Sequence, residues 1–350
     1  MIVWFDALTP KQALLMAMCK LKFESLGYDT LLTTRQHDCT CWLLDELGIE
    51  YAVVGGYGGA SRKGKLRASL ERSMKLFKLI SDLDEKPVLH VSLSSPEATR
   101  IAFGLGIPII LFNDTPHSIY VNRLTLPLAS KVIVPEAIPS EAFSYAIDSR
   151  RIVHYRGVDE VAWMRNFKPN KSVLDQLDLS INDRIVLIRS EEAKASYYPS
   201  LKTYPTIAFA REVLKRCSDV KVVYLARYGD QRTYARRILR NAIVPSEAVD
   251  SRSLAYYSCL VVSGGGTVSR EGALLGTPSI CLFRSRLHVN DWLERMGFPI
   301  YSFKRVRDAV EFAVKVLSNP DSYRINVREQ LNKLEDPVEV LVRVWREMGG

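Results

Sequence analysis

Long apolar runs, clustered cysteines and repeated segments are all missing from this sequence. No apolar stretch approaches the roughly 18–20 residues that a membrane-spanning helix needs, and the chain begins without the basic, apolar and small-residue pattern of a secretion signal. The six cysteines are scattered, so we expect buried, reduced thiols in a cytoplasmic protein. His37, Cys39 and Cys41 lie close together but lack a matching second pair. Asp82-Leu83-Asp84 has the spacing of an acidic metal motif but ends a predicted helix. We therefore expect no metal and no resident cofactor.

Basic residues outnumber acidic ones. The 350 residues include 48 Lys and Arg against 39 Asp and Glu, a formal net charge of +9. Nucleic acid, an anionic membrane surface and phosphorylated small molecules could each attract such a chain. No nucleic-acid module is recognisable and aromatics do not alternate with the basic clusters, which argues against nucleic acid. We instead expect a lipid-linked or phosphorylated molecule at the cytoplasmic face of a membrane as the partner. The protein would then be peripheral to that membrane. The oligomeric state is left open.

Short apolar strands alternate with amphipathic helices along both halves of the chain, as in an α/β fold with doubly wound parallel sheets. The second half restarts at Arg184–Arg189 after a polar stretch without strands, and another strand is expected near Ala242–Val244. The predicted organisation is an N-terminal Rossmann-like domain (1–156), a linker (157–182), a C-terminal Rossmann-like domain (183–335) and a final helix (336–350) that packs back on the first domain.

The most informative stretch runs from Val261 to Phe283. It predicts an apolar strand, a glycine-rich turn, a helix and a second strand. Glycines lack a Cβ, so a ligand can approach the backbone of the turn, and the amide hydrogens of the following helix attract phosphate. A dinucleotide fingerprint would need glycine in place of Ser269. The stretch predicts a phosphate-and-sugar site for a nucleotide, and the structural alternative is a tight turn without a ligand.

A second glycine-rich stretch nearly matches a Walker A phosphate loop. Residues Gly59 to Lys65 follow that pattern, but Leu66 stands where the metal-binding Ser or Thr is required. We therefore reject an ATPase. A basic loop that contacts a phosphate of the acceptor remains an alternative.

The Val261–Phe283 stretch resembles the donor-nucleotide motif of GT-B glycosyltransferases and of the related non-hydrolysing sugar-nucleotide 2-epimerases. The whole chain also resembles an uncharacterised, mainly archaeal family of GT-B-like proteins known as a domain of unknown function. The stretches that carry this second resemblance are Trp4-Phe5-Asp6, Ser95-Pro96-Glu97-Ala98, Phe112-Asn113-Asp114, Asn122 to Leu128 and Pro135 to Pro139. The resemblance implies two Rossmann-like domains that face a cleft, with the acceptor on the N-terminal domain and a nucleotide sugar on the C-terminal domain. It also favours UDP as the nucleotide.

In the resembling families a Ser/Gly-rich loop holds the diphosphate and a helix glutamate holds the ribose. The corresponding turn residues here are Ser263, Gly264, Gly265, Gly266 and Thr267. Glu271 would hold the ribose. Arg189 ends the first strand of the second domain and is the expected phosphate cation, unless it pairs with the glutamates that follow it. His288 and Asn290 lie where those families contact the sugar or base; their structural alternative is a surface loop.

A glycosyl acceptor needs a general base, which we expect at a strand end of the first domain. The candidates are Asp6, Asp114, His117 and Glu97. Asp114 and His117 share one loop, where a carboxylate can orient an imidazole. The structural alternatives are a turn-capping aspartate and a surface histidine.

The sequence therefore predicts a metal-independent GT-B glycosyltransferase that uses a nucleotide sugar. Two alternatives stay open: a UDP-sugar 2-epimerase-like isomerase and a non-catalytic nucleotide-binding protein. The resembling epimerases place a carboxylate just after the fourth strand, but here none occurs before Glu97, which counts against epimerisation.

Overall fold

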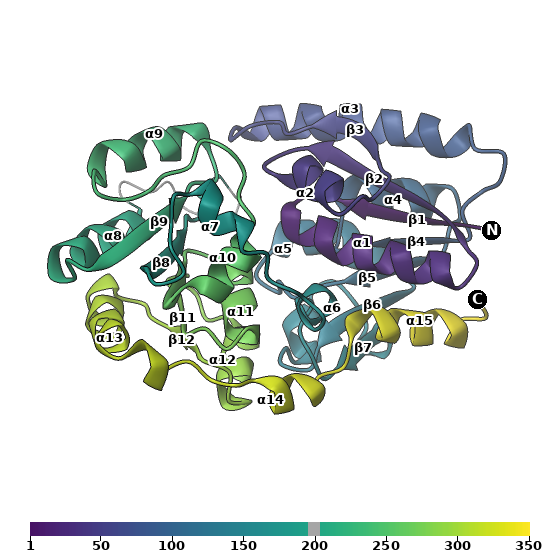
Figure 1. Ribbon diagram of the computed structural model, residues 1–350. Coiled ribbons are helices and arrows are strands. Elements are labelled where there is room, and N and C mark those ends of the chain that lie inside the picture. Colours follow the sequence, from purple (N-terminus) through teal and green to yellow (C-terminus); the bar gives the residue numbers. More distant parts are fainter. Residues whose placement is uncertain (195–203) are drawn as a thin grey trace. The chain divides into compact units, whose positions relative to one another are not determined.

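The computed structural model describes residues 1–194 and 204–350. The chain forms two compact units, each built on one parallel sheet (Figure 1). Unit 1 comprises Met1–Trp163 together with Leu334–Gly350, and unit 2 comprises Met164–Lys333. The division falls within residues 157–182, the predicted linker. This stretch contains the short helices α6 (Val161–Met164) and α7 (Ser172–Gln176).

The sheet of unit 1 has seven strands in the order β3-β2-β1-β4-β5-β6-β7. The middle strands β1, β4 and β5 are buried along nearly their whole length because helices cover both faces of the sheet; Val3 and Phe5 of β1, for example, are fully buried. The strand order reverses between β1 and β4, and such a switch point is where open parallel sheets bind ligands. The strands are β1 (Ile2–Ala7), β2 (Asp29–Gln36), β3 (Ala52–Gly56), β4 (Leu89–Ser92), β5 (Ile109–Phe112), β6 (Lys131–Pro135) and β7 (Ile152–Tyr155).

The helices of unit 1 form two groups. Helix α1 packs on α2 and α15, whereas α3 packs on α4 and α4 on α5. Right-handed crossovers run outward from the switch point in both directions, which places the two groups on opposite faces of the sheet. The helices are α1 (Pro10–Ser25), α2 (Thr40–Glu46), α3 (Arg62–Ser81), α4 (Pro96–Gly104), α5 (Ile119–Thr125) and α15 (Pro337–Glu347), with 3-10 turns at Leu126–Leu128, Ser140–Phe143 and Ser149–Arg151.

The sheet of unit 2 has five parallel strands in the order β12-β11-β10-β8-β9. Strand β8 is buried on both faces: Val186 and Ile188 join one core, whereas Ile185 and Leu187 join the other. The strand predicted near Ala242–Val244 is wrong, because the structure has only an isolated bridge between Ile243 and Val223 there. The strands are β8 (Arg184–Arg189), β9 (Val220–Leu225), β10 (Leu260–Ser263), β11 (Ser279–Cys281) and β12 (Ile300–Ser302).

Helices cover both faces of the second sheet as well. Helices α8 and α13 pack together over the core that contains Ile188, and α7 and α10 contribute to the core that contains Leu187. No helix of the described residues has the length and apolarity needed to cross a bilayer. The remaining bounds are α8 (Pro205–Arg216), α9 (Gly229–Ile238), α10 (Ser251–Tyr257), α11 (Thr267–Leu274), α12 (His288–Arg295), α13 (Val306–Ser318) and α14 (Arg328–Asn332), with a 3-10 turn at Pro320–Ser322.

Candidate functional site

The glycine-rich turn of unit 2 connects β10 to α11 and passes directly over the end of β8. The amide of Gly264 donates to the carbonyl of Arg189 at 3.1 Å, which ties the turn to that strand. A Cβ on Gly264 would overlap the side chain of Glu191 and lie 2.9 Å from its Cα. A Cβ on Gly265, in contrast, would meet no atom within 4 Å among the described residues beyond its chain neighbours. The turn is therefore packed against the protein at Gly264 and open at Gly265.

Three side chains donate to the carbonyl of Gly265. They are the hydroxyls of Ser263 and Ser269, the latter at 3.2 Å, and the thiol of Cys281 at 3.3 Å. In a trans peptide the following N–H points the opposite way, so the amide of Gly266 is directed away from these groups. The described residues supply no hydrogen-bond acceptor for the amides of Gly265, Gly266 and Thr267. Free amides at a helix N-terminus favour an anion.

Two charged side chains follow on the first turns of α11. Arg270 and Glu271 are 5% and 3% exposed, so both are held inside the unit instead of extending into solvent. The space needed for this close approach of α11 to the sheet comes from Gly272, where a Cβ would lie 3.0 Å from Val261 of β10. The structure thus places Glu271 one turn along α11 from these amides.

Arg189 is half-buried at the end of β8, and its Nη1 donates to the carbonyl of Ala226 at 3.3 Å. The glutamates beside it have other partners. Glu191 accepts from the amide and the hydroxyl of Thr206 at 2.7 and 2.8 Å, and Glu192 forms an ion pair with Arg227 at 3.1 Å. Burial raises the pKa of Glu191, and the bonds from Thr206 oppose that rise.

His288 and Asn290 lie at the start of helix α12 and not in a loop. His288 is half-buried. Asn290 is 1% exposed, and neither its amide nitrogen nor its carbonyl oxygen has a hydrogen-bond partner of good geometry within the described residues. Its amide lies close enough to Cys281 to lower the pKa of that thiol, although burial raises this pKa overall. A buried amide without partners is costly, and this one lies beside the thiol that contacts the glycine-rich turn.

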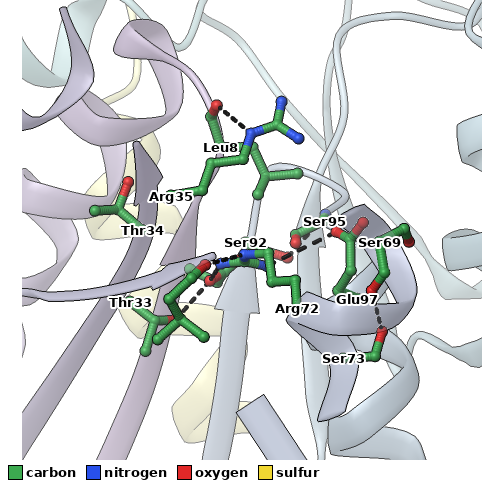
Figure 2. Close-up of polar contacts among 12 residues, drawn as sticks. Leu8, Thr33, Thr34, Arg35, Ser69, Arg72, Ser73, Ser92, Ser95 and Glu97 are labelled. Carbon is green, nitrogen blue, oxygen red and sulfur yellow. Dashed lines mark hydrogen bonds and ion pairs between the residues drawn. The ribbon is translucent and has the colours of Figure 1, made fainter. Parts of the chain in front are cut away.

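A second polar cluster lies at the switch point of unit 1 (Figure 2). Asp6, at the end of β1, is fully buried and accepts from Thr33 and from Nη2 of Arg72, both at 2.5 Å. Arg72 lies on α3, and its Nη1 is 3.7 Å from Glu97 of α4 without a hydrogen bond. Figure 2 shows Arg72 beside Glu97, whereas Arg35 reaches away to the carbonyl of Leu8. Asp6 is therefore a buried ion-pair partner.

The start of α4 leaves several polar atoms of this cluster unsatisfied. Within the described residues the Ser95 and Thr99 hydroxyls, one Glu97 oxygen and one Asp6 oxygen have no hydrogen-bond partner. His90 is satisfied: its Nδ1 donates to the carbonyl of Trp4 and its Nε2 accepts from the Ser92 hydroxyl, each at 3.2 Å in this tautomer. Burial lowers the pKa of His90 to about 4, so the ring is neutral.

A third cluster surrounds Lys11 of α1. Its Nζ lies 2.5 Å from Asp114, 2.8 Å from Asp159 and 3.6 Å from Glu160. Asp114 is 8% exposed, and the structure pairs it with this lysine. His117 follows Asp114 in the same loop and is half-buried. Burial raises the pKa of Asp159, and Lys11 opposes that rise.

Several residues of these clusters were not among the sequence candidates. Lys11 and Arg72 are basic residues within predicted helices, and Asp159 falls in the predicted linker. Their partners are far away in sequence, so spacing alone gives no signal for them. The sequence shows Glu191 as a neighbour of Arg189. That its side chain packs against Gly264 depends on tertiary structure and could not be predicted. No group of three or more His, Cys, Asp or Glu within the described ranges could hold a metal ion.

Two doubly wound parallel-sheet units, with a glycine-rich strand-to-helix turn in the second, define a GT-B-like α/β protein. The chain belongs to the family described as protein of unknown function (DUF354), whose model matches residues 1–348. An uncharacterised protein of Methanocaldococcus jannaschii is 29% identical over 345 residues, which cover 97% of this chain and 96% of that protein. The family and the fold predicted from the sequence are confirmed.

Solved structures with this fold include sugar-nucleotide enzymes. The UDP-GlcNAc 2-epimerase of Methanocaldococcus jannaschii, in complex with UDP-GlcNAc and UDP, aligns with a TM-score of 0.68 and 15% identity, over 98% of this chain and 100% of that one. A glycosyltransferase from Rickettsia africae aligns with a TM-score of 0.64 and 13% identity, over 99% and 98%. At these identities the likeness shows the fold alone.

Proposed function

We propose that this protein is a metal-independent glycosyltransferase that binds a nucleoside diphosphate sugar, with UDP the favoured nucleotide, at the β10–α11 turn. The observation that carries the proposal is the group of three amides at Gly265, Gly266 and Thr267 that have no acceptor within the described residues, beside a position where a ligand meets no Cβ. Such amides bind phosphate oxygens without a metal. A solved glycosyltransferase and a solved UDP-GlcNAc 2-epimerase both share this fold.

Each donor-side residue has a distinct role in this proposal. Transfer breaks the bond between the sugar and the diphosphate, so negative charge develops on the departing phosphate. The turn amides and the guanidinium of Arg189 would stabilise that charge. Glu271 would accept hydrogen bonds from the ribose hydroxyls, and the unsatisfied amide of Asn290 would donate to and accept from the base or the sugar.

The acceptor hydroxyl must lose a proton as the new glycosidic bond forms. Asp114 is our proposed base, because it lies at the end of β5 and remains 8% exposed, whereas Asp6 is fully buried in an ion pair. Its neighbour Lys11, 2.5 Å away, would orient the carboxylate, and His117 in the same loop is the second candidate. Full turnover by Asp114→Asn would remove Asp114 from this role.

The first test is calorimetric titration with UDP, GDP, CDP, TDP, ADP and their sugar conjugates, in EDTA and then with Mg²⁺. One nucleoside diphosphate should bind in EDTA, and Glu271→Ala should weaken that binding at least about tenfold, the effect of losing a hydrogen bond to a charged group. Glu294→Ala on α12 is the matched control, because Glu294 is exposed. Equal affinities of wild type and Glu271→Ala would refute the ribose role, and binding of none of the nucleotides would refute the donor site.

The second candidate is epimerisation at C2 of the bound sugar. It is favoured by the number of solved neighbours that are UDP-GlcNAc 2-epimerases, two of them bound to UDP-GlcNAc. Incubating the bound nucleotide sugar alone in D₂O separates the two reactions. An epimerase exchanges the C2 hydrogen for deuterium and forms the C2 epimer, whereas a transferase leaves C2 unchanged until an acceptor is added.

A further inference from the structure

Helix α3 of unit 1 carries an apolar stripe on its outer side. Four residues spaced by four, four and three positions share one face of a helix, and here all four are large and apolar. A different side of α3 packs inward, through Leu76 and Ile80, and the four stripe residues are exposed, so the stripe is no part of the core. The four residues, with their exposed fractions, are Leu66 (62%), Leu70 (60%), Met74 (68%) and Phe77 (45%).

The helices that follow α3 in this layer also expose large apolar side chains. Helix α3 packs on α4 and α4 on α5, and each contributes further exposed apolar side chains. They are Phe103 (54%) on α4 and Ile119 (43%), Tyr120 (72%) and Leu124 (61%) on α5. These eight residues, the α3–α5 apolar surface, are more than half of the fifteen large apolar side chains exposed in the described residues. Exposed apolar side chains gathered on three helices that pack in sequence are typical of an interaction surface.

Basic residues surround the α3–α5 apolar surface. Outside the buried Arg72, helix α3 carries six basic residues and a single acidic one, Glu71. On α4 the only acidic residue, Glu97, is buried, and α5 has none. The basic residues of the three helices that lie outside the core are Arg62, Lys63, Lys65, Arg67, Lys75, Lys78, Arg100 and Arg123.

We propose that the α3–α5 apolar surface docks unit 1 onto an anionic lipid bilayer, with α3 lying in the interface. A helix with an apolar stripe flanked by Lys and Arg inserts its apolar side at the level of the headgroups and attracts anionic lipids with its charges. The long aliphatic stems of Lys and Arg suit the same position. The inference is independent of the proposed reaction.

The charge pattern of the α3–α5 apolar surface favours an anionic bilayer over a second copy of the chain and over RNA. A second copy of the chain would bring two basic surfaces against each other, at a cost from like-charge repulsion. RNA would be attracted by the charges and could stack on the three aromatic rings, but it would gain little from the five aliphatic side chains of the surface. An anionic bilayer uses both the charges and the apolar stripe.

The test is vesicle flotation with the full chain. One set of vesicles is phosphatidylcholine alone, and the other contains about 30% phosphatidylglycerol, which gives it an anionic surface. Wild type should float only with the anionic vesicles, and salt should release it. Lys63→Gln/Arg67→Gln/Lys78→Gln should weaken binding on the order of 100-fold, since each charge near such a surface contributes about fivefold. The matched control, Arg240→Gln/Lys304→Gln/Lys333→Gln, removes three exposed charges from unit 2 and should bind like wild type.

A second pair of variants tests the apolar contribution. Leu70→Gln/Met74→Gln should lose binding, whereas Leu21→Gln/Ile181→Gln, exposed at 46% and 55% on other surfaces, should keep it. Wild-type protein that stays with neither vesicle would overturn the proposal. So would light scattering that shows a dimer for wild type and a monomer for Leu70→Gln/Met74→Gln, because the surface would then be a self-interface. RNA binding that the same variant leaves intact, without flotation, would equally overturn it.

Discussion

At the scale of single residues, a buried charge organises the glycine-rich turn of unit 2, and another organises the polar cluster around Asp6 in unit 1. Glu191 lies beneath Gly264 and joins the turn to the first turn of α8 through Thr206. Arg72 performs a similar role in unit 1, where it joins Asp6 to the carbonyl of Val54 at 2.9 Å. Breaking a buried pair leaves an uncompensated charge, which costs several kcal/mol. These residues therefore set where the polar groups around them lie.

The two glycines at the turn offer a direct comparison. Gly265→Ala places a methyl group in open space, so the fold should keep its stability while nucleotide affinity falls at least about tenfold, because the phosphate loses its close approach. Gly264→Ala forces the new Cβ against Glu191 and should destabilise the protein by about 1–3 kcal/mol. Urea unfolding and calorimetric titration of both variants measure the two effects. A Gly265→Ala protein that binds as wild type does would show that the ligand does not pass over this turn.

His90 makes the stability of unit 1 depend on pH. Burial lowers its folded-state pKa to about 4, below the ordinary 6.5. The unfolded chain therefore binds a proton more readily, and the stability that the neutral ring contributes is complete above pH 6.5 and is lost as the pH falls toward 4. Between pH 7 and pH 5 this group should remove about 2 kcal/mol.

Urea unfolding of wild type and His90→Gln at both pH values checks this prediction. Glutamine keeps a donor and an acceptor for Trp4 and Ser92 but does not titrate. The difference between the two proteins should shrink by about 2 kcal/mol on acidification. An equal loss of stability in both proteins would assign the pH dependence to other groups.

At the scale of elements, apolar runs could be predicted from the sequence and tertiary partners could not. Strands such as Ile109–Phe112 are buried along their whole length, so their apolar runs are unambiguous. The three-residue strand β12 is too short to give a pattern. Ile243 pairs through only one bridge, since Pro245, two residues on, cannot donate to a ladder.

In the candidate site, too, local features could be predicted from the sequence and distant partners could not. The glycine-rich turn is a local feature, and its residues lie together as the sequence predicts. The partner of Asp114 is Lys11, 103 positions away, whereas the sequence offered only the neighbouring His117. The resemblance made Asn290 a candidate contact of the sugar or base, with a surface loop as the alternative. The structure places it on α12, and its amide is buried without a hydrogen-bond partner of good geometry among the described residues.

At the scale of the whole molecule, both ends of the chain build unit 1. The segment after Leu334 returns from unit 2, and the amide of Glu335 donates to the carbonyl of Arg156 at 2.8 Å. Helix α15 then packs on α1 and β6. Its Trp345 donates to the hydroxyl of Tyr28 at 3.2 Å. Unit 1 is therefore complete only after the last residues have been synthesised.

This arrangement predicts that a change in α15 acts on unit 1. Leu341 is fully buried, so Leu341→Ala should cost about 2–5 kcal/mol through the cavity that it leaves. The loss should appear as faster hydrogen exchange in α1 and β6, with exchange in β8 and β10 unchanged, because local stability follows the packing of each unit. The exposed neighbour Arg343→Ala is the control. Faster exchange spread equally over both units would show that they unfold as one cooperative body, so that α15 would support the whole chain and not unit 1 alone.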